Sequence, residues 1–322
     1  MISASIIAHS RSEEGIDLYT WMLRYPKFIH GEFMTHRKFS RNASSSRAIP
    51  TKKLLEEVRS DELRAAPVFW GKNQAGMQAA AELSREYVQD DLCVPYDQAK
   101  KDWAAAAHAA ADHAQKLADL GAHKQIVNRI LEPFLHINVV ASATDINNFF
   151  GLRLDAAAQP EIRVLAEKMW EAKETSVPRI LKPGDWHVPF VDPDEAVDLF
   201  RIDPGEWPAI PIKVSVARCA RVTHLSFVTG KKSTVEEDLQ LYDKLLGSQP
   251  IHASPAEHQA TPDSFGLVSF DKESSDELNS RYSISMNVEW ENLYDHGNFT
   301  GWRQFRKMIP GENIAPLPSE YR

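Results

Sequence analysis

The segment from Thr35 to Arg47 carries the side chains of this chain that are best suited to binding chemistry. Five of the twelve residues from His36 to Arg47 are basic or imidazole side chains, Asn42 and four serines lie among them, and no acid is present. The whole chain, by contrast, has a formal net charge of -8. Arginine offers a rigid fork of donors, and serine and asparagine add short, directional ones. The segment predicts a pocket for an anion such as a phosphate; the alternative is a solvated charged loop.

The order of these residues is more specific than their composition. The spacing His-Arg-x-x-Ser-x-Asn-x-x-Ser-x-Arg resembles the signature of the flavin-dependent thymidylate synthases. In that family the first basic residues touch the flavin, and the last serine and arginine hold the phosphate of dUMP. The resemblance implies one set of residues for each ligand: His36, Arg37, Ser40 and Asn42 for the flavin, and Ser45, Ser46 and Arg47 for the nucleotide.

Two segments further along the chain resemble the same family. Arg129 stands four residues before Pro133, as does an arginine that contacts the nucleotide in the family; taken alone, it is an ordinary surface arginine on a short helix. Asn148 to Arg153, with Gln159 six residues later, is similar to the family's Asn-Phe-x-x-Leu-Arg segment. The resemblance implies that Asn148 contacts the flavin and Arg153 the nucleotide, while the apolar residues between them also suit a core.

Three positions depart from the family pattern. The family usually has Glu two residues before the final signature serine, where this chain has Ala43. Thr144 and Ala157 stand where the family often has Arg and His. The sequence therefore supports the predicted preference for a uracil base less strongly than it supports the predicted binding of the phosphate.

Two more matching segments lie in the second half of the chain. Ala217 to Thr223 is similar to the family's Ala-Arg-Val-Ser strand, although it also reads as an ordinary strand with exposed arginines. His252 to His258 resembles the family's His-x-Ser-Pro-x-Glu-His segment, which implies that His258, with Glu257, lies by the flavin and the folate. A metal site built from His252, Glu257 and His258 is disfavoured, because the spacing matches no standard zinc motif.

The order of the segments is unusual, because typical members carry the last two before the His-Arg signature. A circularly permuted arrangement of the same fold explains this order, provided that the termini lie close together. In typical members a Gln and an Arg just before the signature help to bind the nucleotide, and here Glu32 and Thr35 occupy those positions. Gln304 and Arg306, from the Arg-Gln-aromatic-Arg pattern near the end of the chain, are candidates to replace them.

The elements that must position these residues are predicted mainly from apolar spacing. We expect a strand at the N-terminus and helices near 13–25, 28–39, 74–89, 98–119, 122–132, 160–173 and 234–246, the last with Thr234 as a possible cap. The proline-rich stretch 182–211 predicts a loop-rich connector rather than a helix, and 212–217 alternates like a strand. This divides the chain into a helix-rich part, 1–181, a connector, 182–211, and an α+β part, 212–322, which together form one catalytic domain.

Composition narrows the class of protein. The chain has 322 residues, 43% of them hydrophobic and 25% charged, which is ordinary for a soluble globular protein. No apolar run is long enough for a membrane span, and the first residues do not resemble a signal peptide. Cys93 and Cys219 are far apart and without a partner motif, which argues against a disulfide scaffold or a cysteine-rich metal site. We therefore expect a cytoplasmic protein. A pI near 5.9 argues against nucleic-acid binding.

The resemblance as a whole implies an α+β enzyme with long helices and a small antiparallel sheet. It would be an FAD-dependent thymidylate synthase that converts dUMP to dTMP with methylenetetrahydrofolate and NADPH, without a metal and as a homotetramer. Ser45 and Arg153 are the residues to which we would assign catalysis. Neither cysteine has the context of a nucleophile, and each is better explained as a small buried side chain. Two alternatives remain: one-carbon modification of another pyrimidine nucleotide, and a non-catalytic nucleotide-binding protein.

Overall fold

The computed structural model describes the chain except for residues 77, 88–93, 226–230, 248, 274–282 and 315–322. The described chain forms two compact units. Unit 1 comprises residues 1–7, 21–141 and 146–176, and unit 2 comprises residues 8–20, 142–145 and 177–322. Each unit is therefore assembled from three separate segments of the sequence.

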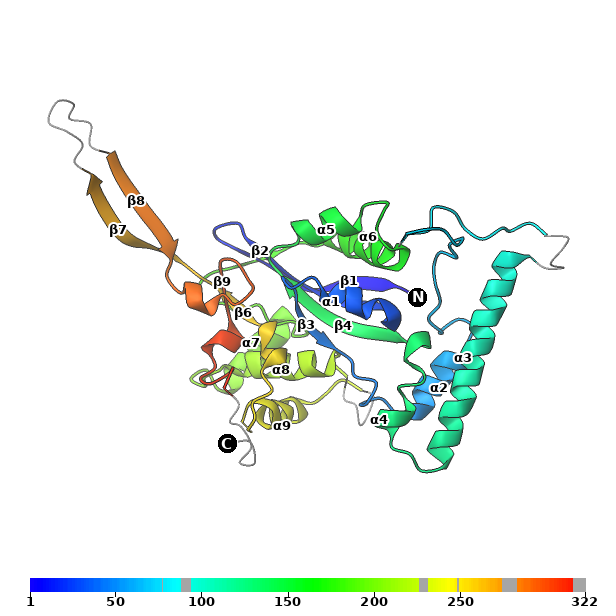
Figure 1. Ribbon diagram of the computed structural model, residues 1–322. Helices are drawn as coiled ribbons and strands as arrows, with labels where there is room; N and C mark the ends of the chain where they lie inside the picture. The colour runs from blue at the N-terminus through cyan, green and yellow to red at the C-terminus, as the bar shows by residue number, and fades with distance from the viewer. Residues whose placement is uncertain (77, 88–93, 226–230, 248, 274–282, 315–322) are drawn as a thin grey trace, which may run out of the picture. The chain divides into compact units, whose positions relative to one another are not determined.

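A five-stranded sheet has the order β3-β4-β2-β1-β5 (Figure 1). Its strands are β1 Ser3–Ser12, β2 Asp17–Pro26, β3 Ser40–Ala43, β4 His136–Ala143 and β5 Arg179–Leu181. The predicted N-terminal strand is confirmed, whereas the helix expected over 13–25 is wrong. Trp21, Leu23 and Tyr25 are fully buried, and the residues between them are less so. This period of two is that of a strand with one face in the core.

Unit 1 contains most of the helical residues predicted for the first half of the chain. Its helices are α1 His30–Met34, α2 Thr51–Arg59, α3 Pro95–Asp119, α4 Lys124–Val127, α5 Asn147–Arg153 and α6 Pro160–Glu174, with the 3-10 turns η1 Lys27–Ile29 and η2 Glu132–Phe134. The helices predicted at 98–119 and 160–173 are confirmed as α3 and α6. Those expected at 28–39 and 122–132 are shorter than predicted, because turns follow α1 and α4.

The helix expected near 74–89 is wrong for the residues that the structure describes. The backbone there pairs across the chain instead: Lys72 N donates to Ala81 O at 2.7 Å and Leu83 N donates to Trp70 O at 2.8 Å. Further along, α3 presents Ala107, Ala111 and Ala114 on one buried stripe. These small side chains let α2 and α4 pack closely on α3. Figure 1 shows α2 beside the long helix α3.

In its described residues, unit 2 combines three helices with two small sheets. Its elements are α7 Pro193–Ile202, α8 Ile210–Arg221, α9 Val235–Leu246, β6 Ala260–Pro262 paired with β9 Trp302–Gln304, and β7 Phe265–Glu273 paired with β8 Ser283–Trp290. Three 3-10 turns, η3 Ser254–Glu257, η4 Leu293–Asp295 and η5 Phe305–Met308, connect them. The helix predicted at 234–246 is confirmed as α9, and Thr234 caps it in a capping box with Glu237.

Two expectations for unit 2 are wrong. The proline-rich stretch contains α7, and the residues 212–217 belong to α8 rather than to a strand. Pro193 and Pro211 both lie in a first turn, where a helix needs no amide hydrogen from them. Prolines that break a helix interior thus start these two helices.

The predicted class, α+β with long helices and small sheets, is confirmed. The pairing of β5 with β1 is parallel, with Ser10 opposite Arg179, so the larger sheet is not wholly antiparallel. Among the described residues, the search for a helix long and apolar enough to cross a membrane finds none.

Candidate active site

The His-Arg signature lies in unit 1, in the turn after α1, along β3 and in the turn that follows β3. Arg41 closes the first of these turns from inside, because its Nη1 donates to the carbonyls of Met34 at 2.9 Å and His36 at 3.1 Å. Ser40 is buried and Asn42 is half-buried in the strand. One basic residue of the segment is therefore used to shape the loop rather than to bind a ligand.

His36 and Arg153 are brought together, although 117 positions separate them in the sequence. Arg153 Nε donates to His36 Nε2 at 2.8 Å, and the His36 ring packs edge-on against Phe149. Burial, with Arg153 and Arg41 nearby, lowers the pKa of His36 to about 4. His36 is thus neutral at neutral pH, and its proton is on Nδ1 because Nε2 accepts from Arg153.

Glu132 organises the turn after β3. Its Oε1 accepts from Ser46 Oγ at 2.6 Å, from Lys27 Nζ at 2.6 Å and from Arg129 Nη1 at 3.2 Å. Burial raises the pKa of Glu132, but the hydrogen bonds from Lys27 and Ser46 outweigh it and hold that pKa below its usual value. Ser46 and Arg129 are therefore already bonded to a carboxylate. The position of Glu132 three residues after Arg129 indicates only the ion pair with that arginine, whereas its contacts with Lys27 and Ser46 have no sequence signal.

Four predicted side chains of unit 1 are exposed: Arg37, Ser45, Arg47 and Asn148. Neither Arg37 nor Arg47 makes a hydrogen bond or ion pair with another residue that the structure describes. Exposed arginines without an internal partner keep all their donors for a ligand. Guanidinium, hydroxyl and amide groups are each suited to bind phosphate oxygens.

Glu257, His258, Gln304 and Arg306 lie together in unit 2. Gln304 is buried, and its Nε2 donates to Glu257 O at 3.0 Å and to Asn298 Oδ1 at 2.9 Å. Arg306 forms ion pairs with Glu257 and Glu312. These two predicted nucleotide ligands thus support the His252–His258 segment, and their contact with a nucleotide stays a prediction.

His258 is fully buried, and its Nδ1 lies 2.9 Å from Ser142 Oγ. Burial lowers the pKa of His258 to about 3, so the imidazole is neutral at neutral pH. A search of the described residues for three or more His, Cys, Asp or Glu side chains that could hold a metal ion finds no such group.

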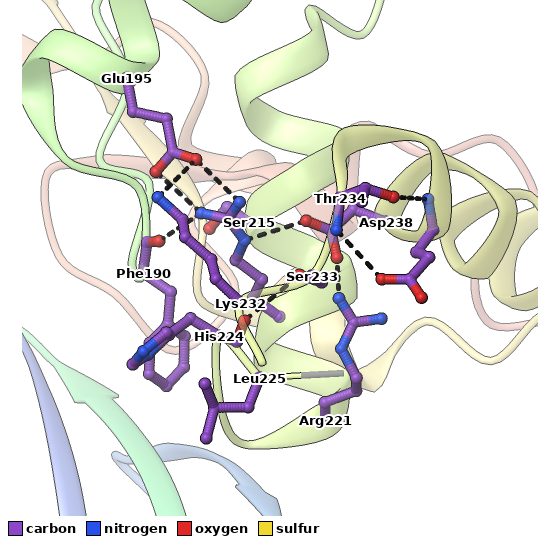
Figure 2. A network of polar contacts seen from close by, with 12 residues as sticks. Phe190, Glu195, Ser215, Arg221, His224, Leu225, Lys232, Ser233, Thr234 and Asp238 are labelled. Carbon is purple, nitrogen blue, oxygen red and sulfur yellow. Dashed lines mark hydrogen bonds and ion pairs between the residues drawn. The ribbon is translucent and has the colours of Figure 1, made fainter. Parts of the chain in front are cut away.

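The 217–223 segment covers the end of α8, at Arg221, and the two residues that follow. The strand reading expected exposed arginines, but Arg218 and Arg221 are buried. Arg218 is 1% exposed; it donates to both carboxylate oxygens of Glu195 at 2.9 and 2.8 Å and to Asp238 at 3.0 Å. Arg221 forms an ion pair with Asp238, and Lys232 forms another with Glu195, as Figure 2 shows. This network ties α7 and α9 to α8, which is a structural role.

One of the two cysteines, Cys219, lies in the part of the chain that the structure describes. Cys219 is buried in α8, and burial raises the pKa of its thiol well above the usual range, as expected of a small core side chain. Cys93 lies outside the described residues.

Comparisons with known proteins agree with the segments in unit 1. The model of the Thy1 family, described as thymidylate synthase complementing protein, matches residues 17–179. This range contains the His-Arg signature, Arg129 and the segment from Asn148 to Arg153. The segments 217–223 and 252–258 lie outside it, so the permuted order stays a prediction. The search of curated proteins finds no match.

Two similar solved structures are of a UMP/dUMP methylase, PolB, from Streptomyces cacaoi. The form bound with 5-Br UMP has a TM-score of 0.38 and 19% identity, over 54% of this chain and 88% of that chain. The form bound with 5-Br dUMP has a TM-score of 0.40 and 19% identity, over 54% of this chain and 90% of that chain. The family model alone spans half of this chain, and the chain therefore belongs to the Thy1 family, whose members are enzymes of the thymidylate synthase type.

Proposed function

We propose that this protein catalyses the flavin-dependent reductive methylation of dUMP to dTMP, with methylenetetrahydrofolate as the one-carbon donor and NADPH as the reductant. The observation that supports this most directly is the complete His-Arg signature inside the range matched by the family model. The residues on which binding would depend are also those that unit 1 leaves exposed or holds in a fixed orientation.

The residues of unit 1 suit a flavin nucleotide. Arg37 and Asn148 are exposed donors, and the neutral His36 keeps its Nδ1–H because Arg153 occupies Nε2. Arginine, amide and imidazole donors match the phosphates and ring carbonyls of FAD. The family resemblance also implies flavin contacts for Ser40 and Asn42 in unit 1 and, separately, for Glu257 and His258 in unit 2. When bound, the flavin supplies the hydride transfer, and the protein supplies position and charge.

Arg153 is the residue to which we assign the reacting nucleotide. Its Nε is held by His36, and its two terminal nitrogens make no hydrogen bond with any residue in the described part of the chain. The contact fixes the guanidinium plane and leaves a two-nitrogen fork for an anion. Such a preorganised charge can stabilise negative charge that develops on the pyrimidine or can bind the phosphate. Ser45 and Arg47 would hold the phosphate beside it.

One observation favours a different substrate of the same class. Ala43 is exposed at the end of β3, so a methyl group stands where the family usually has a carboxylate. Loss of that carboxylate weakens any contact with the uracil ring, and another pyrimidine nucleotide is therefore the second candidate. We also propose a cytoplasmic homotetramer, as the family resemblance implies.

The test is the visible absorption spectrum of the purified protein, recorded anaerobically before and after addition of NADPH with dUMP, UMP or no nucleotide. We expect a flavin band that bleaches with NADPH and bleaches faster with the preferred nucleotide. Product formation from labelled methylenetetrahydrofolate follows in the same samples. In Arg153→Ala the nucleotide effect should disappear. Arg163→Ala is the matched control, because Arg163 is a half-buried arginine on α6 that pairs with Glu167. A protein that binds the nucleotide but no added FAD would be a non-catalytic binder.

A further inference from the structure

A chain of five buried side chains leads away from His258 inside unit 2. Starting from His258 Nδ1, it runs to Ser142 Oγ at 2.9 Å, to Thr20 Oγ1 at 2.6 Å, to His187 Nε2 at 2.8 Å, and from His187 Nδ1 to Ser10 Oγ at 2.8 Å. None of the five residues is more than 4% exposed. Their positions in the sequence lie far apart, so the fold itself assembles this chain.

The backbone of His187 is fixed beside the His258 segment. Ala260 lies two residues after His258. His187 N donates to Ala260 O at 2.9 Å, and Ala260 N donates to His187 O at 3.4 Å. The His187 ring also packs against Trp302 in β9, with 6.4 Å between ring centroids. The two imidazoles are thus held in one frame, and neither can turn freely to change its partner.

Burial lowers the pKa of both His187 and His258 to about 3, so each ring carries one proton at neutral pH. Every link of the chain needs one hydrogen, and each hydroxyl has only one to give. If His187 carries its proton on Nδ1, Thr20 must donate to His187 Nε2. Ser142 must then donate to Thr20, and His258 must donate from Nδ1. The position of one proton on His187 therefore fixes the position of the proton on His258.

His258 Nε2 indicates which of the two arrangements holds. This nitrogen is buried and has no hydrogen-bond partner in the described structure. A buried N–H without an acceptor is rarer in folded proteins than an acceptor without a donor. The favoured arrangement leaves Nε2 bare and places the His258 proton on Nδ1, toward Ser142. His187 then donates from Nδ1 to Ser10, at the other end of the chain.

We propose that His187 is a positioning residue that acts through Thr20 and Ser142 to keep His258 in the tautomer with a bare Nε2. His258 Nε2 is then a hydrogen-bond acceptor, and a group that contacts this nitrogen must offer an N–H rather than a carbonyl. The consequence for flavin or folate rests on the proposed function, but the coupling of the two rings does not. The chain also gives a role to His187, in a stretch that resembles no family segment.

The test is ¹⁵N NMR of the histidine-labelled full-length protein without ligands, because a protonated and a bare ring nitrogen give well-separated signals. In the wild type we expect a bare Nε2 and a protonated Nδ1 on His258. Ser10→Ala removes the acceptor for His187 Nδ1–H, so the original arrangement now also contains a buried N–H without an acceptor. It loses its advantage, and a substantial fraction of the molecules should adopt the arrangement in which the His187 proton is on Nε2 and every link is reversed. The ratio of His258 tautomers should change by about tenfold or more in favour of the Nε2-protonated form.

Thr20→Val cuts the chain in the middle and should also change the His258 tautomer, because Ser142 loses its acceptor. Thr20→Ser keeps the hydroxyl and should restore the wild-type spectrum. Thr261→Val is the matched control. Thr261 is a buried threonine whose hydroxyl oxygen accepts a hydrogen bond from Gly184 N at 2.8 Å, and it does not belong to the chain of hydrogen bonds between the two histidines.

Unchanged His258 signals in both Ser10→Ala and Thr20→Val, or a protonated Nε2 in the wild type, would overturn the proposal. Because no ligand is present, this result is separate from the flavin spectrum that tests the proposed function.

Discussion

The buried guanidinium of Arg218 allows a stability prediction with a defined magnitude. Arg218→Met keeps much of the side-chain volume and removes the charge. The variant loses two hydrogen bonds to Glu195, one to Asp238 and one to the carbonyl of Phe190. Phe190 has a positive φ of 64°, which is unfavourable for a bulky side chain, and the bond from Arg218 helps to hold it there.

The loss should be large, because Asp238 is fully buried and, among the residues that the structure describes, keeps Arg221 alone as a cationic partner. Removing one member of a buried ion pair typically costs about 3–5 kcal/mol. The loss of the partner of Glu195 should cost less free energy, since the Glu195 side chain is 19% exposed and keeps its ion pair with Lys232. We therefore expect a loss of about 3 kcal/mol, near the lower end of that range.

The assay is urea unfolding followed by tryptophan fluorescence and circular dichroism. With a denaturant dependence of about 2–3 kcal/mol per M, the midpoint should fall by roughly 1–1.5 M. Arg201→Met is the control, because Arg201 pairs with Asp198 on the exposed surface of α7 and should change stability by less than about 0.5 kcal/mol. If Arg218→Met lost no more than this control, the buried network would not be the support that we infer.

Three further predictions concern the cap, the phosphate site and acid stability. Thr234→Ala removes the N-cap of α9 and should lower the free energy of unfolding by about 1 kcal/mol. Thr234→Ser keeps a capping hydroxyl and should retain most of the wild-type stability. Equal stability of the wild type and both variants would contradict the capping box. Arg47→Ala should raise the dissociation constant for dUMP by roughly 10- to 100-fold in equilibrium dialysis, since charge-assisted hydrogen bonds are lost, and Lys52→Ala should leave it unchanged. Burial, with His9, His258 and Arg179 nearby, lowers the pKa of His187 to about 3, so the unfolded chain takes up a proton there that the folded chain refuses. The free energy of unfolding should therefore fall as the pH drops from the ordinary histidine pKa toward 3. In unfolding experiments at about pH 7 and about pH 4.5, His187→Gln should lose less stability between the two pH values than the wild type. An equal loss in both proteins would argue against a neutral buried His187.

Local spacing made the candidate residues of unit 1 recognisable from sequence, and their roles stay predictions. The residues from His36 to Arg47 lie within one turn, one strand and the next turn, so their spacing alone could carry the resemblance. Arg153 could be proposed because it ends a short motif on α5, and the structure adds its contact with His36. Glu132 was missed because its importance comes from Lys27 and Ser46, which are distant in the sequence.

The failures have equally specific causes. Ile212, Val214 and Val216 alternate with polar residues as a strand would, yet α8 is buried around most of its circumference, so apolar spacing could not distinguish the two. His187, Thr20 and Ser142 carry no motif at all. Their relation depends on contacts across as many as 167 positions, which only the fold reveals.

The segmented composition of unit 2 has a consequence for synthesis. Residues 8–20 belong to unit 2, and Ile16 O accepts from Trp302 Nε1 at 3.2 Å, across 286 positions. At about 5–20 residues per second, a ribosome needs roughly 15–60 s to make that stretch of chain. The first strands of the nascent protein must therefore wait that long, with Leu18 unable to reach the core it shares with Phe299 and Trp302. We expect translation speed and chaperone supply to affect the yield of this protein more than that of a chain whose units are contiguous.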